Sequence, residues 1–131
     1  MRAGDLDNTA APAVGFRFEE VVYLYGKIDA GARAQLEYNL FTRDYNVYLI
    51  SLLPERKVAA KCFKWNVPYT RVIHVDSLLE IPEVCKAHRM LEYFDRDEKV
   101  LENVGMTGFQ TKGTKWTSPE DFSPSSSMKT D

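Results

Sequence analysis

Basic and aromatic side chains are concentrated between Arg56 and Arg71, where the chain has five basic residues, three aromatic residues and no acidic residue. The formal net charge of the whole chain is −2, so this excess of positive charge is local. Single-stranded nucleic acid binds where cations meet its phosphates and aromatic rings stack on its bases. The sequence therefore predicts a nucleic-acid-binding site formed by Lys57, Lys61, Phe63, Lys64, Trp65 and Arg71.

The segment 57–65 is predicted to be an extended strand, in which successive side chains point to opposite faces of a sheet. Lys57, Lys61, Phe63 and Trp65 would then share one face. An alternative interpretation places Phe63 and Trp65 in the protein core and only the lysine side chains at the surface. The sequence leaves both interpretations open.

The cysteines and histidines offer little for metal binding or catalysis. The spacing Cys62-x11-His74-x10-Cys85-x2-His88 differs from the short paired spacings of zinc modules, so we expect no metal site. Cys85 and His88 would share one helix face, but no nucleophile elbow accompanies them. We expect no catalytic residue, and an enzyme built on this pair is the third-ranked hypothesis.

The acidic run Asp95-Arg96-Asp97-Glu98 lacks the glycine and the distal glutamate of a calcium-binding loop. It is therefore predicted to be a solvated helix end. The seven glycines are scattered and form neither a dinucleotide-binding nor a Walker pattern, so we expect no cofactor.

Length and composition are those of a single globular domain. The chain has 131 residues, of which 44% are hydrophobic and 27% are charged. Two cysteines are too few for a disulfide scaffold, and no apolar run resembles a signal peptide or a membrane span. We expect a reduced intracellular protein, cytoplasmic or nuclear, with no membrane contact.

Three regions are expected along the chain: a flexible leader over 1–15, one domain over 16–116 and a disordered serine- and proline-rich tail over 117–131. The segment 45–53 is apolar on both faces, which predicts a central strand. Further strands are expected from alternation and from β-branched and aromatic content. The other expected strands cover 16–28, 34–41, 57–65, 69–75 and 109–116.

The pattern becomes helical after Asp76. Ser77 and Glu80 fit a capping box, and Pro82 suits a first helical turn, which predicts a helix over 82–94. The expected fold is α+β, with a mostly antiparallel sheet of five or six strands. The sheet would form a meander or a half-open barrel, and the helix near the C-terminus would pack on one of its faces.

Two short motifs resemble a known family. VVYLYGKI at 21–28 is followed by LPER at 53–56. The N-terminal, non-catalytic region of the catalytic subunit of DNA polymerase alpha, a family B polymerase, has similar elements at similar spacing, although the order of charges after Pro54 departs from it. The resemblance covers 21–57. It implies a β-rich module that packs beside the template, with a role in replication and no catalytic residue. The matching residues are Val22, Leu24, Gly26, Lys27, Leu53 and Pro54.

The first functional hypothesis is therefore a non-catalytic binding module for single-stranded nucleic acid, associated with replication. The second is a protein-interaction adaptor that uses a sheet edge or a helix face, with tyrosine anchors at Tyr23, Tyr25, Tyr45 and Tyr48. A homodimer is expected if one face of the sheet is left bare.

Overall fold

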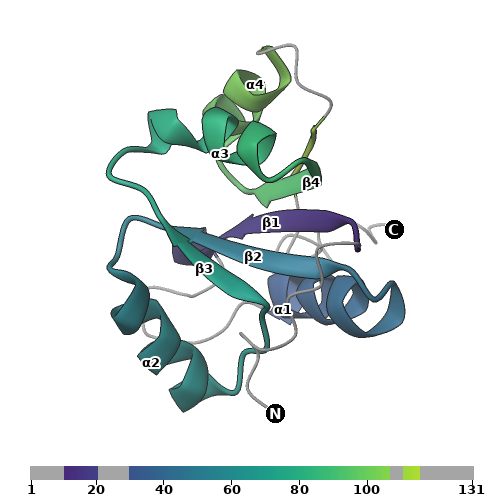
Figure 1. Ribbon diagram of the computed structural model, residues 1–131, viewed down its shortest axis with the longest axis vertical. Coiled ribbons are helices and arrows are strands. Elements are labelled where there is room, and N and C mark those ends of the chain that lie inside the picture. The colour runs from purple at the N-terminus through teal and green to yellow at the C-terminus, as the bar shows by residue number, and fades with distance from the viewer. Residues whose placement is uncertain (1–10, 21–29, 107–110, 116–131) are drawn as a thin grey trace, which may run out of the picture.

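The protein has an α/β fold built on a parallel sheet, seen in the computed structural model, which describes residues 11–20, 30–106 and 111–115 (Figure 1). The sheet has five strands in the order β3-β2-β1-β4-β5, and every neighbouring pair is parallel. The strands are β1 (Ala13–Arg17), β2 (Asn46–Ser51), β3 (Arg71–His74), β4 (Met90–Asp95) and β5 (Lys112–Lys115).

Helices connect successive strands. They are α1 (Ala30–Glu37), α2 (Glu55–Trp65), α3 (Ile81–Ala87) and α4 (Glu98–Met106), and α1 continues into a π-helical turn at Tyr38–Thr42. Short 3-10 turns lie at Phe18–Glu20 and Leu78–Glu80. Parallel strands require such crossovers, whereas a tight turn can join only antiparallel strands.

The expected α+β fold with a mostly antiparallel sheet and one helix is wrong, because every pair of neighbouring strands is parallel and two of the expected strands are helices. The segment 34–41 lies in α1 and the π-helical turn, and the segment 57–65 lies in α2. The buried residues of each repeat every four positions, as on one side of a helix. The buried apolar residues with this repeat are Ala32, Leu36 and Leu40 in α1 and the π-helical turn, and Val58 and Cys62 in α2.

The single helix expected over 82–94 is also wrong. Helix α3 ends at Ala87, and Arg89 has a φ of 52°, in the left-handed region that ends a helix. The chain then enters β4 at Met90. Ser77 does cap a helical turn, because its hydroxyl accepts a hydrogen bond from the backbone N–H of Leu79, but that turn is the 3-10 turn before α3.

Other expectations agree with the structure. Strand β2 is central and buried along its whole length, as predicted for 45–53, and strands lie within the segments 69–75 and 109–116. Strand β1 begins at Ala13, inside the range expected as a leader. The strand expected over 16–28 is present only at Phe16 and Arg17, which end β1, and Phe18–Glu20 form a 3-10 turn instead. The rest of that segment and the tail over 117–131 lie outside the described residues.

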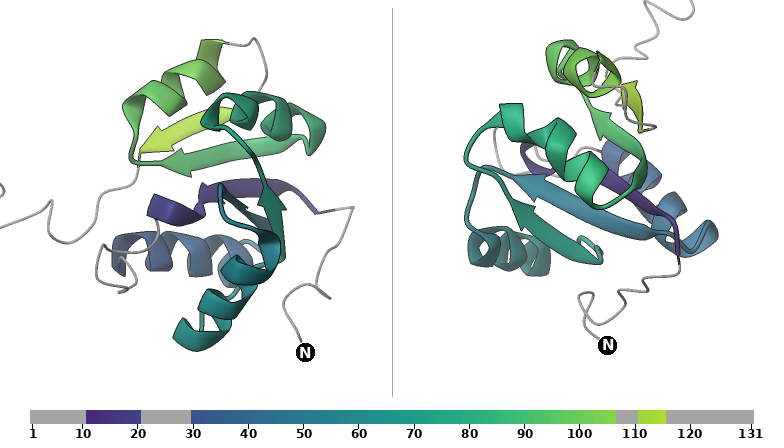
Figure 2. Two further views of the ribbon diagram at one scale, coloured as in Figure 1. Left: turned by 90° about the vertical axis from the view of Figure 1, so that its left-hand side faces the viewer. Right: turned by 45° about the horizontal axis from the view of Figure 1, so that its top comes forward.

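Helices cover both faces of the sheet, α1 and α2 on one side and α3 and α4 on the other (Figures 1 and 2). Phe16 and Phe94 stack in the first core, with ring centroids 4.4 Å apart, against Leu36 and Val58. Ile50, Tyr93 and Cys85 lie in the second core. Because neither face is bare, the condition under which a homodimer was expected is not met. None of the described helices is long and apolar enough to span a membrane.

Candidate nucleic-acid interface and the carboxyl edge of the sheet

The lysines of the predicted site lie on the outer side of α2. Lys57, Lys61 and Lys64 are exposed, and they follow the helical spacing of three and four residues that places side chains on one face. Phe63 is 87% exposed and projects from the same helix, about 100° or more around its axis from the lysines. The strand geometry predicted for this segment is wrong, but the helix still places the lysines on one side and leaves one aromatic ring open to solvent. We call Arg56, Lys57, Lys61, Phe63 and Lys64 the α2 surface.

Trp65 lies at the border of this surface. Its ring is half-buried against the core between the sheet and α1 and α2. The ammonium of Lys61 lies 5.5 Å from the ring centroid, within the range of a cation–π contact. The alternative of a core position is therefore partly correct for Trp65, whereas Phe63 is open to solvent.

Arg71 does not join the other residues of the predicted site. It begins the edge strand β3, and its guanidinium carbon lies 5.9 Å from the ring centroid of Tyr48. Tyr48 belongs to the core that faces α3 and α4, so the sheet separates Arg71 from the lysines of α2.

Charged side chains lie at both ends of α2. Its acidic residue, Glu55, lies at the N-terminus, where the helix dipole favours negative charge. At the C-terminus, Asn66 adopts a left-handed φ of 56°, and Arg33 of α1 donates hydrogen bonds to the carbonyls of Trp65 (3.1 Å) and Asn66 (2.6 Å). Arg33 thereby holds α2 against α1 and satisfies carbonyls that would otherwise lower the local potential.

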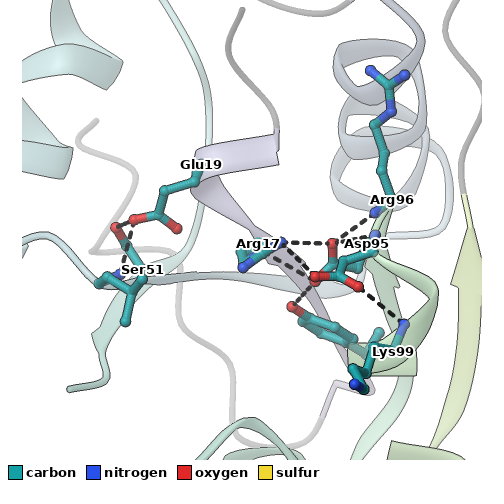
Figure 3. Close-up of polar contacts among 9 residues, drawn as sticks. Arg17, Glu19, Ser51, Asp95, Arg96 and Lys99 are labelled. Carbon is teal, nitrogen blue, oxygen red and sulfur yellow. Dashed lines mark hydrogen bonds and ion pairs between the residues drawn. The ribbon is translucent and has the colours of Figure 1, made fainter. Parts of the chain in front are cut away.

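A second group of charged residues lies at the carboxyl edge of the sheet (Figure 3). The chain proceeds from β1 to β2 and β3 on one side, then returns to β4 and β5 on the other, so the winding reverses between β1 and β4. Ligands of open α/β sheets bind outside the carboxyl ends of the strands at such a point. Arg17 ends β1 there, and Asp95 ends β4.

Arg17 and Asp95 form a buried ion pair. Nε of Arg17 lies 3.1 Å from Oδ2 of Asp95, and Nη2 donates to Oδ1 at 3.3 Å. Oδ2 also accepts from the Tyr93 hydroxyl at 2.7 Å, and Oδ1 from the backbone N–H groups of Arg96 (2.7 Å) and Asp97 (2.9 Å). Burial is the main cause that raises the pKa of Tyr93, so the hydroxyl stays a donor. Both oxygens of Asp95 are thus engaged within the protein.

Glu19 makes a separate contact at the same edge. Its Oε2 accepts from the Ser51 hydroxyl at 2.5 Å and from the backbone N–H of Leu52 at 2.8 Å, which ties the turn after β1 to the end of β2. Side chains alternate along a strand. Ser51 is two residues after Leu49 of the first core, and Asp95 is two residues after Tyr93 of the second. The two contacts therefore lie on different sides of the sheet.

The cysteines and histidines do not converge. Cys62 lies on α2 and Cys85 on α3, across the sheet from each other. Burial raises the pKa of each thiol to about 12, so both are protonated and poor nucleophiles. Within the described residues, no group of three or more histidine, cysteine or acidic side chains is placed to hold a metal ion.

His74 ends β3 at the same edge. Nδ1 lies 2.9 Å from the Leu53 carbonyl oxygen, and Nε2 lies 3.0 Å from Oδ1 of Asp76. The hydrogen bond to the Leu53 carbonyl, followed by that to Asp76, raises the pKa of His74. A protonated ring can donate to both acceptors at once.

The sequence interpretation missed the carboxyl edge. Asp95 was expected on a solvated helix end, but it is fully buried at the end of a strand. The available signal was that Arg17 and Asp95 each follow an apolar run directly. Once the strands are taken as parallel, their carboxyl ends meet at one edge, and opposite charges there predict a pair. Asp97 and Glu98 are partly solvated as expected, with side chains 42% and 73% exposed.

Comparison of the chain with protein-family models, with curated proteins and with solved structures found no match.

Proposed function

We propose that this protein is a non-catalytic module that binds single-stranded nucleic acid through the α2 surface. The observation that carries the proposal is the exposure of Lys57, Lys61 and Lys64 on one side of a helix that also exposes Phe63. Lysines contact phosphates regardless of base sequence, and an open ring stacks on any base. The expected specificity is therefore low.

Affinity should depend strongly on salt. Three or four phosphate contacts, from the three lysines and Arg56, release counterions and give a slope of log K against log salt concentration of about −2 to −3 for a single strand. Stacking on Phe63 adds about 1–3 kcal/mol that salt does not affect.

The state of the carboxyl edge supports the non-catalytic part of the proposal. A general base or metal ligand needs a free lone pair, but the oxygens of Asp95 accept from four protein groups. The buried thiols of Cys62 and Cys85 are protonated. A Cys85–His88 enzyme is correspondingly disfavoured.

Association with replication rests on the resemblance to the polymerase region. Its second motif contains Leu53 and Pro54, which immediately precede α2, so the matched segment and the α2 surface adjoin. The β-rich module that the resemblance implied is not the fold of this chain, and the first motif, at 21–28, lies outside the described residues.

Charge reversal on α2 tests the proposal. Lys61→Glu with Lys64→Glu should weaken binding of a labelled single strand at least tenfold, because two phosphate contacts become repulsions. Lys99→Glu with Lys112→Glu changes the net charge equally at exposed positions outside α2 and is the matched control. Equal losses of affinity in both double variants would show that only the net charge of the protein matters. That result would contradict binding through the α2 surface.

Protein interaction is the second candidate function. It is favoured by the exposure of Phe63, Leu79 and Met106, which are 87%, 77% and 81% exposed. The expected tyrosine anchors are less suitable, because Tyr48 is buried and Tyr45 is half-buried. Tyr23 and Tyr25 lie outside the described residues.

A further inference from the structure

A pocket of about 400 Å³ opens between the turn before α3 and the last turn of α4. Leu79 and Met106 line it and are 77% and 81% exposed. Large apolar side chains that cluster in solvent mark a contact surface. We call this cavity the α3–α4 pocket, and its lining residues are Leu79, Pro82, Glu83, Asn103 and Met106.

Acidic side chains lie at this pocket, in contrast to the basic side chains of α2. Glu83 lines the pocket itself, and Glu80 and Glu102 are exposed next to lining residues. Helix α2 has four basic residues and one acidic residue, and Phe63 projects from it. The two surfaces are therefore complementary in both charge and apolar character.

The two surfaces lie in different layers of the molecule. Helix α2 packs on one face of the sheet, and α3 and α4 pack on the other (Figure 2). The α2 surface of a chain therefore cannot reach its own α3–α4 pocket. Contact between them requires two molecules and joins different patches of each.

We propose that the α3–α4 pocket binds the α2 surface of a second copy of this chain. Phe63 of one copy inserts between Leu79 and Met106 of the other, and the lysines of α2 face Glu83. The contact is head-to-tail, so it can propagate from copy to copy. This proposal does not rest on the proposed nucleic-acid binding. Because both contacts use α2, a single strand and a second copy of the chain compete for that surface.

Sedimentation velocity over a concentration series tests the proposal. The wild-type protein should associate, and less so at high salt. Phe63→Ser and Met106→Lys should each weaken association at least about thirtyfold, as expected for a central apolar contact. Both side chains are exposed, so the fold should survive, which a thermal melt verifies. Leu91→Ser, which changes a half-exposed apolar residue outside both surfaces, should associate like the wild type.

Mixing the two defective variants gives the decisive result. Phe63→Ser keeps an intact pocket, and Met106→Lys keeps an intact α2 surface, so the mixture should form a 1:1 dimer and stop there. A mixture that stays monomeric, or a wild type that stays monomeric up to about 1 mM, would overturn the proposal. Met106→Lys should still bind a single strand. Failure of self-association and failure of nucleic-acid binding can therefore be told apart.

Discussion

Replacing Arg17 with methionine is expected to lower the free energy of unfolding by about 3 kcal/mol, at the lower end of the range for removing one partner of a buried ion pair. Methionine keeps most of the side-chain length, so the loss comes from the charge. Asp95 would remain buried but would keep its hydrogen bonds from Tyr93, Arg96 and Asp97. These three donors limit the cost of leaving its charge without the guanidinium.

Replacing Asp95 with leucine should cost more, about 5 kcal/mol, because four donors lose their acceptor at once. Arg17 would keep the carboxylate of Asp97, which lies 3.8 Å from Nη2 and is partly exposed. A domain of this size is stable by about 5–15 kcal/mol, so this variant is expected near the limit of folding.

The double variant Arg17→Met, Asp95→Leu measures the interaction between the two side chains separately from the cost of each single substitution. Because it leaves no unpaired buried charge, it should be at least about 2 kcal/mol more stable than the sum of the single losses predicts. Urea unfolding followed by circular dichroism gives these free energies, provided that the m-value is unchanged. Lys99→Met makes a similar change at an exposed site and should stay within about 0.5 kcal/mol of the wild type. If Arg17→Met lowers the free energy of unfolding by less than about 1 kcal/mol, the reasoning is refuted, because an ion pair exposed to solvent contributes no more than that.

Two further predictions concern titratable groups. The folded pKa of His74 is raised from 6.5, so its contribution to stability is present below pH 6.5 and is lost as pH rises through the folded pKa. His74→Gln should therefore be less stable than the wild type at about pH 5.5 and nearly equal at about pH 8.5, and urea unfolding showing a larger deficit at the higher pH would contradict this. Cys62 and Cys85 should react slowly with a thiol reagent at neutral pH in the folded protein and rapidly in urea, because burial raises both pKa values to about 12. Rapid labelling of a single thiol in the folded protein would show that its site opens.

The sequence predicted the strands better than it predicted their arrangement. Strand β2 was identified because Val47, Leu49 and Ile50 form an apolar run, as in a strand covered on both faces. Helix α1 was mistaken for a strand because Leu36, Tyr38 and Leu40 alternate over a short window, although Tyr38 is 50% exposed. Within about eight residues an apolar pattern can fit both the period of a strand and that of a helix, so packing decides which of the two forms.

The candidate site was predicted in part for a similar reason. Lys57, Lys61 and Lys64 lie together on α2 because helical spacing also places them on one side. The position of Arg71 depends instead on which face of the sheet its side chain points to, and the local sequence pattern does not indicate that face. The Arg17–Asp95 pair required knowledge that β1 and β4 are parallel neighbours. Residues 78 positions apart in the chain meet only through that topology.

Fluorescence anisotropy of a labelled single strand of about 20 nucleotides, titrated with the wild-type protein at several salt concentrations, tests the proposed function most directly. Binding through the α2 surface predicts a linear fall of log K with log salt concentration and a slope of about −2 to −3. No binding at low salt, or binding with a slope near zero, would contradict the claim that Lys57, Lys61 and Lys64 contact the phosphates of a single strand.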